Sequence, residues 1–179
     1  QGNAITGTPQ TLTIEGGIPT NPIEKAIFKD GVWDSNTLME KALDGGRING
    51  SATKEIIDHG TTGDFDSTYD GKGGNDTIKG GTGSDTYIWR RGAGNDRIEE
   101  AQGDADNTDT SRLEGLNRSD VQLSMDVDQN LIITIIKDAD GSVIMGPKQT
   151  LTVTGHFAGK SIEQLVFANG DSLNAAGIR

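Results

Sequence analysis

Three glycine-rich units of nine residues, within residues 71–99, constrain the fold of this chain more than any other feature. Glycine fills most of positions one, two and four of each unit, aspartate fills the sixth position and an apolar residue fills the eighth. The units begin at Gly71, Gly80 and Arg91, their aspartates are Asp76, Asp85 and Asp96, and their apolar residues are Ile78, Tyr87 and Ile98. A flexible linker would not keep an apolar residue at one fixed position, so the register indicates a repeating fold.

The residue types in these units favour a calcium site. Glycine permits positive φ and tight turns, and it allows backbone carbonyl oxygens to converge on one point. Calcium prefers six to eight oxygen ligands, which carbonyl and carboxylate groups can supply. The last three residues of each unit, such as 77–79 and 86–88, are short strand material with one apolar side chain facing inward. We therefore expect each unit to be a metal-binding turn followed by a strand.

Two units make one coil, so turns two units apart stack at about the spacing of strands, ~4.8 Å. The turn ending at Asp76 should pair with the turn ending at Asp96. The turn ending at Asp85 needs neighbours, and the degenerate segments 60–66 and 103–109 are the candidates on its two sides. A still earlier unit at residues 48–58 has lost the glycine and aspartate pattern and should form a coil without a full site.

Two well-formed calcium sites follow from this stacking, with two weaker sites beside them. For Asp64, Asp66, Asp104 and Asp106, a solvated turn carboxylate is as consistent with the sequence as a ligand. Glu100 could close a terminal site or face solvent. The candidate ligand residues, through side chain or carbonyl, are Gly60, Thr62, Asp64, Asp66, Gly71, Gly73, Asn75, Asp76, Gly80, Thr82, Ser84, Asp85, Arg91, Ala93, Asn95, Asp96, Glu100 and Asp109.

Folding of this segment should depend on the metal. Ordering nine residues costs more backbone entropy than the burial of one apolar side chain returns. Stacked carboxylates also repel one another, and a bound cation reverses that repulsion. We expect the segment to be loose without calcium and to fold when calcium binds.

The nonapeptides resemble those of the RTX (repeats-in-toxin) family, in which they form a calcium-bound parallel β-roll. The stretch Ile162-Glu-Gln-Leu-Val-Phe-Ala-Asn-Gly170 also resembles the segment that extends and caps such rolls. The resemblance covers residues 48–178. It implies export by a type I secretion apparatus, through a C-terminal signal that this chain lacks, and folding at extracellular calcium concentrations.

A second repeat, of longer period, organises the rest of the chain. Residues 10–16 recur at 149–155 and residues 23–31 recur at 162–170, both at an offset of 139 residues. We expect a piece of a long tandem array. Residues 1–46 would be the tail of a preceding unit, residues 47–109 the calcium-binding roll, and residues 110–179 the flanking and capping β segment.

The expected fold class is all-β, a calcium-bound parallel β-roll extended and capped by flanking strands. The residue pattern predicts one short helix at 35–43, with Ser35 or Asp34 as its N-cap. The predicted strands outside the nonapeptides are residues 11–15, 23–28, 121–125, 130–136, 142–145, 150–154 and 162–167. The turn at 137–141 should join a hairpin.

Composition excludes several function classes. The net charge of −11 argues against nucleic acid and anionic membranes as partners, and no 18-residue apolar run could span a membrane. There is no cysteine, which leaves metal as the available staple. His59 and His156 lie far apart without metal-ligand neighbours, and Tyr87 with Trp89 fits a core better than a sugar platform. No catalytic constellation is evident, so we expect no enzyme.

The sequence thus predicts a calcium-binding module of a large secreted or surface-attached toxin or adhesin, monomeric as a fragment. One alternative is an adhesin module whose flanking β segment binds a glycan or a host receptor. Another is the stabilising tail of a secreted hydrolase, although the 139-residue repeat speaks against it.

Overall fold

The computed structural model describes residues 25–28, 31–34, 47–58, 66–100, 107–159 and 162–178. The chain divides into two compact units, residues 1–38 and 39–179, which are considered separately. In the first unit, β1 (Lys25–Phe28) and β2 (Gly31–Asp34) form an antiparallel hairpin. Strand β1 begins and ends 139 residues before β13 (Gln164–Phe167), so both copies of the repeated segment form a hairpin's first strand.

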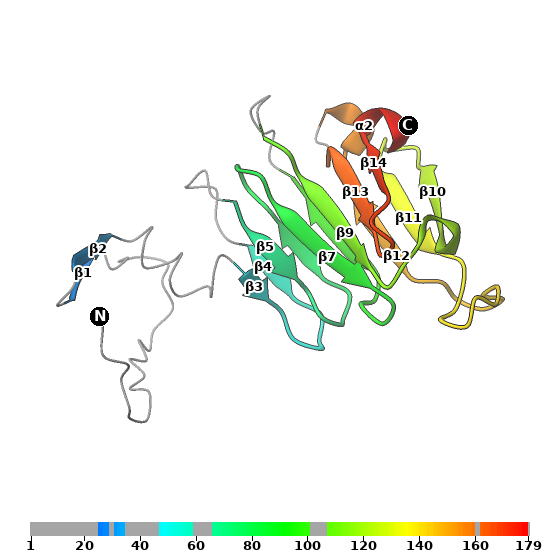
Figure 1. The fold of residues 1–179 in the computed structure, drawn as a ribbon, viewed down its shortest axis with the longest axis horizontal. Helices are drawn as coiled ribbons and strands as arrows, with labels where there is room; N and C mark the ends of the chain where they lie inside the picture. Colours follow the sequence, from blue (N-terminus) through cyan, green and yellow to red (C-terminus); the bar gives the residue numbers. More distant parts are fainter. Residues whose placement is uncertain are drawn as a thin grey trace. The chain divides into compact units, whose positions relative to one another are not determined.

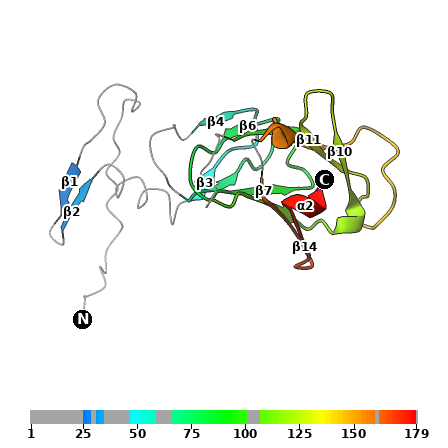
Figure 2. The same ribbon diagram turned by 90° about the horizontal axis from the view of Figure 1, so that it is seen from above.

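The second unit consists mainly of two mixed sheets. Figure 1 shows their strands lengthwise, and Figure 2 shows the sheets as two layers. Sheet I contains, in spatial order, β10 (Val121–Met125), β11 (Leu131–Ile135), β12 (Thr150–Val153), β8 (Asp96–Glu99), β6 (Thr77–Lys79) and β4 (Ile56–Asp58). Sheet II contains β14 (Ser172–Asn174), β13, β9 (Thr110–Glu114), β7 (Thr86–Arg90), β5 (Thr68–Asp70) and β3 (Arg47–Asn49).

The glycine-rich part of the chain crosses from one layer to the other at every strand. Strands β4, β6 and β8 are parallel neighbours in sheet I, while β3, β5, β7 and β9 are parallel neighbours in sheet II. Each strand therefore pairs with the strand two places along the chain. The turns between strands fall into two stacks, one at each side of the layers.

The core lies between the two layers. The apolar residues at the eighth position of the nonapeptides, Ile78, Tyr87 and Ile98, are all buried, as the pattern predicts. The rings of Tyr69 and Tyr87 stack with centroids 5.3 Å apart. Because side chains alternate along a strand, one inward residue in each short strand is enough to connect the layers.

Beyond β9 the chain adds antiparallel strands to the parallel ones. Strand β12 pairs parallel to β8 and antiparallel to β11, and β13 pairs parallel to β9 and antiparallel to β14. The predicted strand at 121–125 is confirmed as β10. The predicted strands at 130–136, 150–154 and 162–167 are each confirmed within about two residues at either end.

Three expectations fare differently. Residues 142–145 form no strand, since only one isolated bridge, Lys137 to Val143, joins them to the turn. The helix expected at 35–43 and the strand at 11–15 lie outside the described residues. The structure instead contains an unpredicted short helix, α2 (Ala175–Ile178), and two 3₁₀ turns, η1 (Arg118–Asp120) and η2 (His156–Ala158). Within the ranges given above, no helix is long and apolar enough to cross a membrane.

Candidate metal centre

The turns stack in two columns, each named here after one of its aspartates. The Asp76 column contains residues 50–55, 71–76 and 91–96, and the Asp85 column contains residues 66–67, 80–85, 107–109 and 162–163. Gly94 shows how closely turns approach within the Asp76 column. Its φ is +105°, and a Cβ there would overlap the carbonyl oxygen of Gly74 in the turn below. Only glycine satisfies both conditions.

In the Asp76 column, carboxylates form a ladder of backbone contacts. The Asp96 Oδ1 atom accepts the Asp76 N–H at 2.9 Å, and Asp76 Oδ1 in turn accepts the Glu55 N–H at 2.9 Å. The residue after each acceptor closes the step, since Arg97 N–H donates to the Asp76 carbonyl and Thr77 N–H to the Glu55 carbonyl. The predicted pairing of the Asp76 and Asp96 turns is therefore present.

The Asp85 column repeats this arrangement. The Ser67 N–H donates to Asp85 Oδ1 at 2.9 Å, and the Asp85 N–H donates to Asp109 Oδ1 at 2.8 Å. Asp66 joins from the side, because its Oδ1 accepts the Ser84 N–H at 2.7 Å. Asp85 thus has the neighbours on both sides that its place in the sequence requires.

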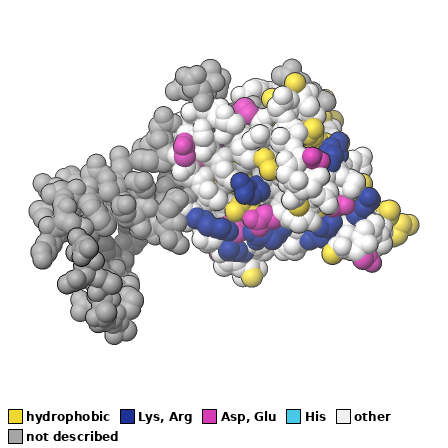
Figure 3. Space-filling model, in the orientation of Figure 1, with side chains coloured by type: hydrophobic (Ala, Val, Ile, Leu, Met, Phe, Trp, Pro, Cys, Tyr) yellow, Lys and Arg dark blue, Asp and Glu magenta, His cyan; other side chains and the backbone are white. Residues whose placement is uncertain are grey.

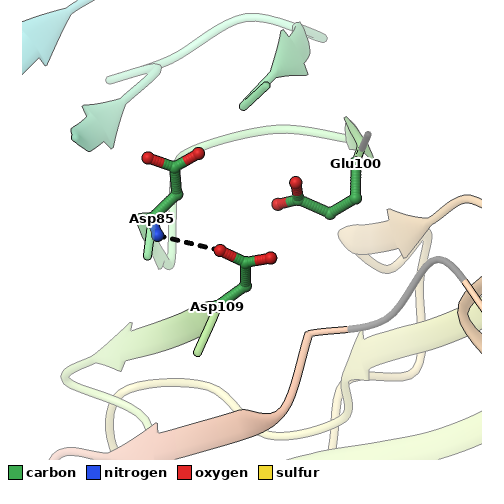
Figure 4. Close-up of side chains that lie close together, drawn as sticks. All are labelled: Asp85, Glu100 and Asp109. Atoms are coloured by element: carbon green, nitrogen blue, oxygen red, sulfur yellow. Dashed lines mark hydrogen bonds between the residues drawn. The ribbon is translucent and has the colours of Figure 1, made fainter. Parts of the chain in front are cut away.

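Asp85, Glu100 and Asp109 form a buried acidic triad in this column. They come from separate stretches of chain, and Figure 4 shows their carboxylates turned toward a common space. Each contributes an oxygen that lies within 4.8 Å of the others, and the residues are 1%, 4% and 6% exposed. Among the described residues this is the one cluster of three such side chains with metal-ligand spacing.

Several oxygens of the triad lack the partners that burial demands. Asp85 Oδ2 and both carboxylate oxygens of Glu100 are buried and accept no hydrogen bond. The buried Tyr87 hydroxyl also has no hydrogen-bond partner. A Cβ on Gly80 would collide with that hydroxyl and lie 2.7 Å from Asp85 Oδ2 and 3.0 Å from Glu100 Oε2. Unpaired buried carboxylate oxygens are costly, so these groups fit a bound cation.

The electrostatics of the triad point the same way. Burial, together with the charges of its acidic neighbours, raises the pKa of Asp85 to about 7, of Glu100 to about 8 and of Asp109 to about 6. Desolvation and like charges both disfavour ionisation. A divalent cation would remove both penalties by pairing with the ionised forms.

The Asp76 column offers a smaller acidic pair. Asp76 Oδ2 is buried and accepts no hydrogen bond. Burial raises the pKa of Asp76, and burial with the charge of Asp76 raises the pKa of Asp96 to about 6. With two carboxylates, a cation here would need carbonyl oxygens of the turns as further ligands.

Other predicted site residues serve the stacking through their side chains. Asn75 Oδ1 accepts the Asn95 N–H at 2.9 Å, Asn95 Oδ1 accepts the Thr150 N–H at 3.0 Å, and Ser84 Oγ accepts the Thr108 N–H at 3.0 Å. These side chains align successive turns. Gly60, Thr62 and Asp64 lie outside the described residues, as do Asp104 and Asp106.

Arg91, a predicted carbonyl ligand, also ties its turn to the flanking segment. Its Nε donates to the Lys137 carbonyl at 3.1 Å and its Nη1 donates to the Gly115 carbonyl, while its Nη2 lies 3.4 Å from Asp120 Oδ2. The arginine stands where the nonapeptide pattern has its first glycine, so this departure from the pattern has a structural use.

Sequence reasoning missed Tyr87 and Glu163 as members of the site. Tyr87 was assigned to the core, which its ring occupies, while its hydroxyl reaches the triad. Glu163 accepts the Asp109 N–H through Oε2 at 2.7 Å. The 139-residue repeat carried a signal for it, because Glu24 stands at the matching position of the first copy.

Asp70 is a buried carboxylate of the opposite kind. It is 0% exposed, and its Oδ2 atom lies 2.6 Å from Arg47 Nη2 and 2.8 Å from both Lys72 Nζ and Arg90 Nη2. Burial alone would raise its pKa, but hydrogen bonds from these cations hold the pKa below the usual range. Figure 3 shows Lys and Arg side chains gathered in a band, with acidic side chains between them, on one face of the molecule.

Comparison with known proteins adds no family assignment. No protein-family model matches the chain, and no curated protein matches it.

Proposed function

We propose that this chain is a non-enzymatic, calcium-binding module of the RTX type, in which stacked nonapeptide turns form a parallel β-roll. The module belongs to a large bacterial toxin or adhesin that leaves the cell by type I secretion. Calcium outside the cell drives its folding. Support comes from the nonapeptide register, from parallel pairing of alternate strands, and from two columns of stacked acidic turns.

The buried oxygens of Asp85 and Glu100 carry the proposal. Three carboxylates are gathered in one space, and among the described residues no lysine or arginine forms an ion pair with them, which a fold stable in its own right would avoid. Asp85, Glu100 and Asp109 would hold one ion, and Asp76 with Asp96 would hold another. The bound ion would supply positive charge between turns that otherwise repel.

Calcium fits these sites better than other common cations. The candidate ligands within the described residues are oxygens, because the chain has no cysteine and His156, the one histidine among those residues, does not belong to the cluster. Hard oxygen ligands exclude a preference for zinc or copper. Magnesium demands near-ideal octahedral geometry, whereas calcium tolerates the irregular mixture of carboxylates and carbonyls that turns present.

Far-ultraviolet circular dichroism tests this proposal. The protein is first measured in EDTA and then titrated with calcium to 10 mM, with magnesium at the same concentration as the control. We expect a cooperative gain of β signal at roughly 0.1–1 mM calcium, the range of extracellular modules, and little gain with magnesium. A full β spectrum in EDTA that calcium leaves unchanged would refute calcium-coupled folding.

A groove in the flanking segment favours a second candidate function, the binding of a surface glycan or receptor. The groove has a volume of about 760 Å³ and combines an aromatic side chain with polar and charged groups, as sugar sites do. Its lining includes Arg118, Ser124, Leu131, His156, Phe157 and Ile178. A glycan array probed with the calcium-loaded protein, with Phe157→Ala as the control, would test this function.

A further inference from the structure

Glu163 occupies a nonapeptide position in a segment that has no nonapeptide. Each ladder step joins two residues by two hydrogen bonds. The carboxylate of the residue that comes later in the chain accepts the backbone N–H of the earlier residue. The residue directly after the later one donates its N–H to the carbonyl of the earlier residue. This two-bond pattern joins Asp85 to Asp109, where Thr110 N–H closes the step at 2.8 Å. It also joins Asp109 to Glu163, where Gln164 N–H closes the step at 3.0 Å.

The two columns differ at this end. In the Asp76 column the next stacked residue is Thr150, whose N–H and hydroxyl both donate to Asn95 Oδ1, and Gln149 accepts the Gly92 N–H. That column continues with neutral side chains. The Asp85 column continues with a carboxylate from the flanking segment, directly after the turn that contains Asp109.

The surroundings of Glu163 make its charge significant. Glu100, with both oxygens buried and without hydrogen bonds, is one neighbour, and Asp109 is another. The charge of Glu163 contributes to the raised pKa of both residues. A further negative charge that acts on Glu100 and Asp109 would destabilise an ion-free site.

We propose that Glu163 is a ligand of the cation at the Asp85–Glu100–Asp109 triad, so that the flanking segment completes a calcium site begun by the glycine-rich turns. This inference rests on the proposed calcium-binding function. It gives the residue directly before strand β13 a role as metal ligand, which the nonapeptide pattern does not contain. Binding of the ion and docking of residues 162–167 then become one event.

Glu163→Gln separates this role from a structural one. Glutamine keeps an oxygen that can accept the Asp109 N–H, but it removes the negative charge. Glu99→Gln is the matched control, because Glu99 lies on β8 beside Glu100 and belongs to no candidate site. Terbium, whose luminescence is sensitised by tyrosine and tryptophan, is the probe, and it is competed off with calcium while circular dichroism monitors folding.

We expect Glu163→Gln to weaken calcium competition at the site by about tenfold or more, since ligand charge sets calcium affinity, and Glu99→Gln to leave it unchanged. Glu163→Asp, which keeps the charge, should recover part of the affinity even if Glu163→Gln folds poorly. If Glu163→Gln binds like the wild type and Glu163→Ala does not, the side chain is only a hydrogen-bond acceptor and the inference is wrong. If the wild type binds no calcium, the proposed function itself fails.

Discussion

Asp70 and the acidic triad are two solutions to the same problem, the burial of carboxylates between stacked turns. Asp70 is surrounded by Arg47, Lys72 and Arg90, all within 2.8 Å of its Oδ2 atom. Among the described residues, no lysine or arginine forms an ion pair with Asp85, Glu100 or Asp109, and these three carboxylates instead face one another. The first cluster is neutralised by the chain itself, and the second needs a charge from outside.

The contrast shows that burial of acid does not by itself indicate a metal site. What distinguishes the triad is that Asp85 Oδ2 and both oxygens of Glu100 lack donors, while the oxygens of Asp70 have several. The pKa shifts have opposite signs for the same reason. Calcium dependence should therefore be confined to the columns of turns, and the Asp70 cluster should stabilise the fold with or without the ion.

The largest expected effect comes from Asp70→Ala. This change leaves three cations without their shared carboxylate and should lower the free energy of unfolding by about 3 kcal/mol, as expected when a buried charge pair loses one member. The loss should be similar in EDTA-free buffer at low and at saturating calcium. Urea unfolding at both concentrations measures it, and a loss that vanishes at saturating calcium would contradict the separation of the clusters.

Glu100→Gln should change stability in opposite directions with and without the ion. In EDTA at pH 8, removal of one repelling charge should shift the folding equilibrium toward the folded state by about 1–2 kcal/mol, so that the variant retains more β signal than the wild type. At 10 mM calcium the same variant should be less stable than the wild type, by about 2 kcal/mol or more, because the ion loses a ligand. Far-ultraviolet circular dichroism in EDTA and thermal melts in calcium test the reversal; a shift of one sign under both conditions would argue against an ion at the triad.

The pH dependence should separate the clusters again. The pKa values of Asp85, Glu100 and Asp109 are raised in the folded state, to about 7, 8 and 6. Without calcium, the folded state then binds more protons than the unfolded state between about pH 4 and pH 8. Stability therefore falls as the pH rises through this window, by at most about 1.4 kcal/mol per pH unit for each group.

Asp70 makes the opposite contribution, because its pKa is lowered in the folded state. Its stabilisation is present above the unfolded pKa, near 4, and is lost as the pH falls through the folded value. Calcium competes with protons, so stability in saturating calcium should rise between pH 5 and pH 8. The β signal in EDTA and urea unfolding in calcium, each at pH 5 and pH 8, measure the two slopes. If stability changed with pH in the same way in EDTA and in calcium, no ion would be bound by the carboxylates whose pKa values are raised.

The smallest effect should come from Lys72, which stands where the nonapeptide pattern has its second glycine. Its φ is +68°, which costs an ordinary side chain roughly 1 kcal/mol. The Lys72 side chain forms an ion pair with Asp70 and is itself 41% exposed. Lys72→Gly loses the pair but relieves the backbone, so the change should stay within about 0.5 kcal/mol. Lys72→Ala keeps the strained φ and should be about 1 kcal/mol less stable than Lys72→Gly in urea unfolding.

The sequence was sufficient to predict the parts of the fold that repeat. The period of nine residues, with one apolar side chain in each unit, predicted inward burial of Ile78, Tyr87 and Ile98 and the pairing of the Asp76 and Asp96 turns. The flanking strands β10–β13 followed from their apolar alternation. Such local regularities appear in the chain because the same physical environment recurs along it.

The parts that could not be predicted depend on contacts between distant residues. Glu163 reaches Asp109 across 54 positions, and Arg90 reaches Asp70 across 20. Residues 142–145 contain a short apolar run typical of a strand, yet exposed Val143 and Met145 have no sheet to join beyond a single bridge. Asp70 ends a strand rather than a glycine turn, so the nonapeptide pattern did not predict that three cationic side chains would surround it.

Each inner aspartate of the ladders takes part in two steps at once, accepting through its carboxylate and donating through its backbone N–H. Asp109 accepts a bond from Asp85 and donates one to Glu163, and Asp76 is shared in the same way between Glu55 and Asp96. Loss of an inner turn thus breaks two steps, while loss of a terminal turn breaks a single step. Stability then behaves as a sum over nearest neighbours, as in linear repeat arrays, and the protein can be shortened from its β3 end one coil at a time.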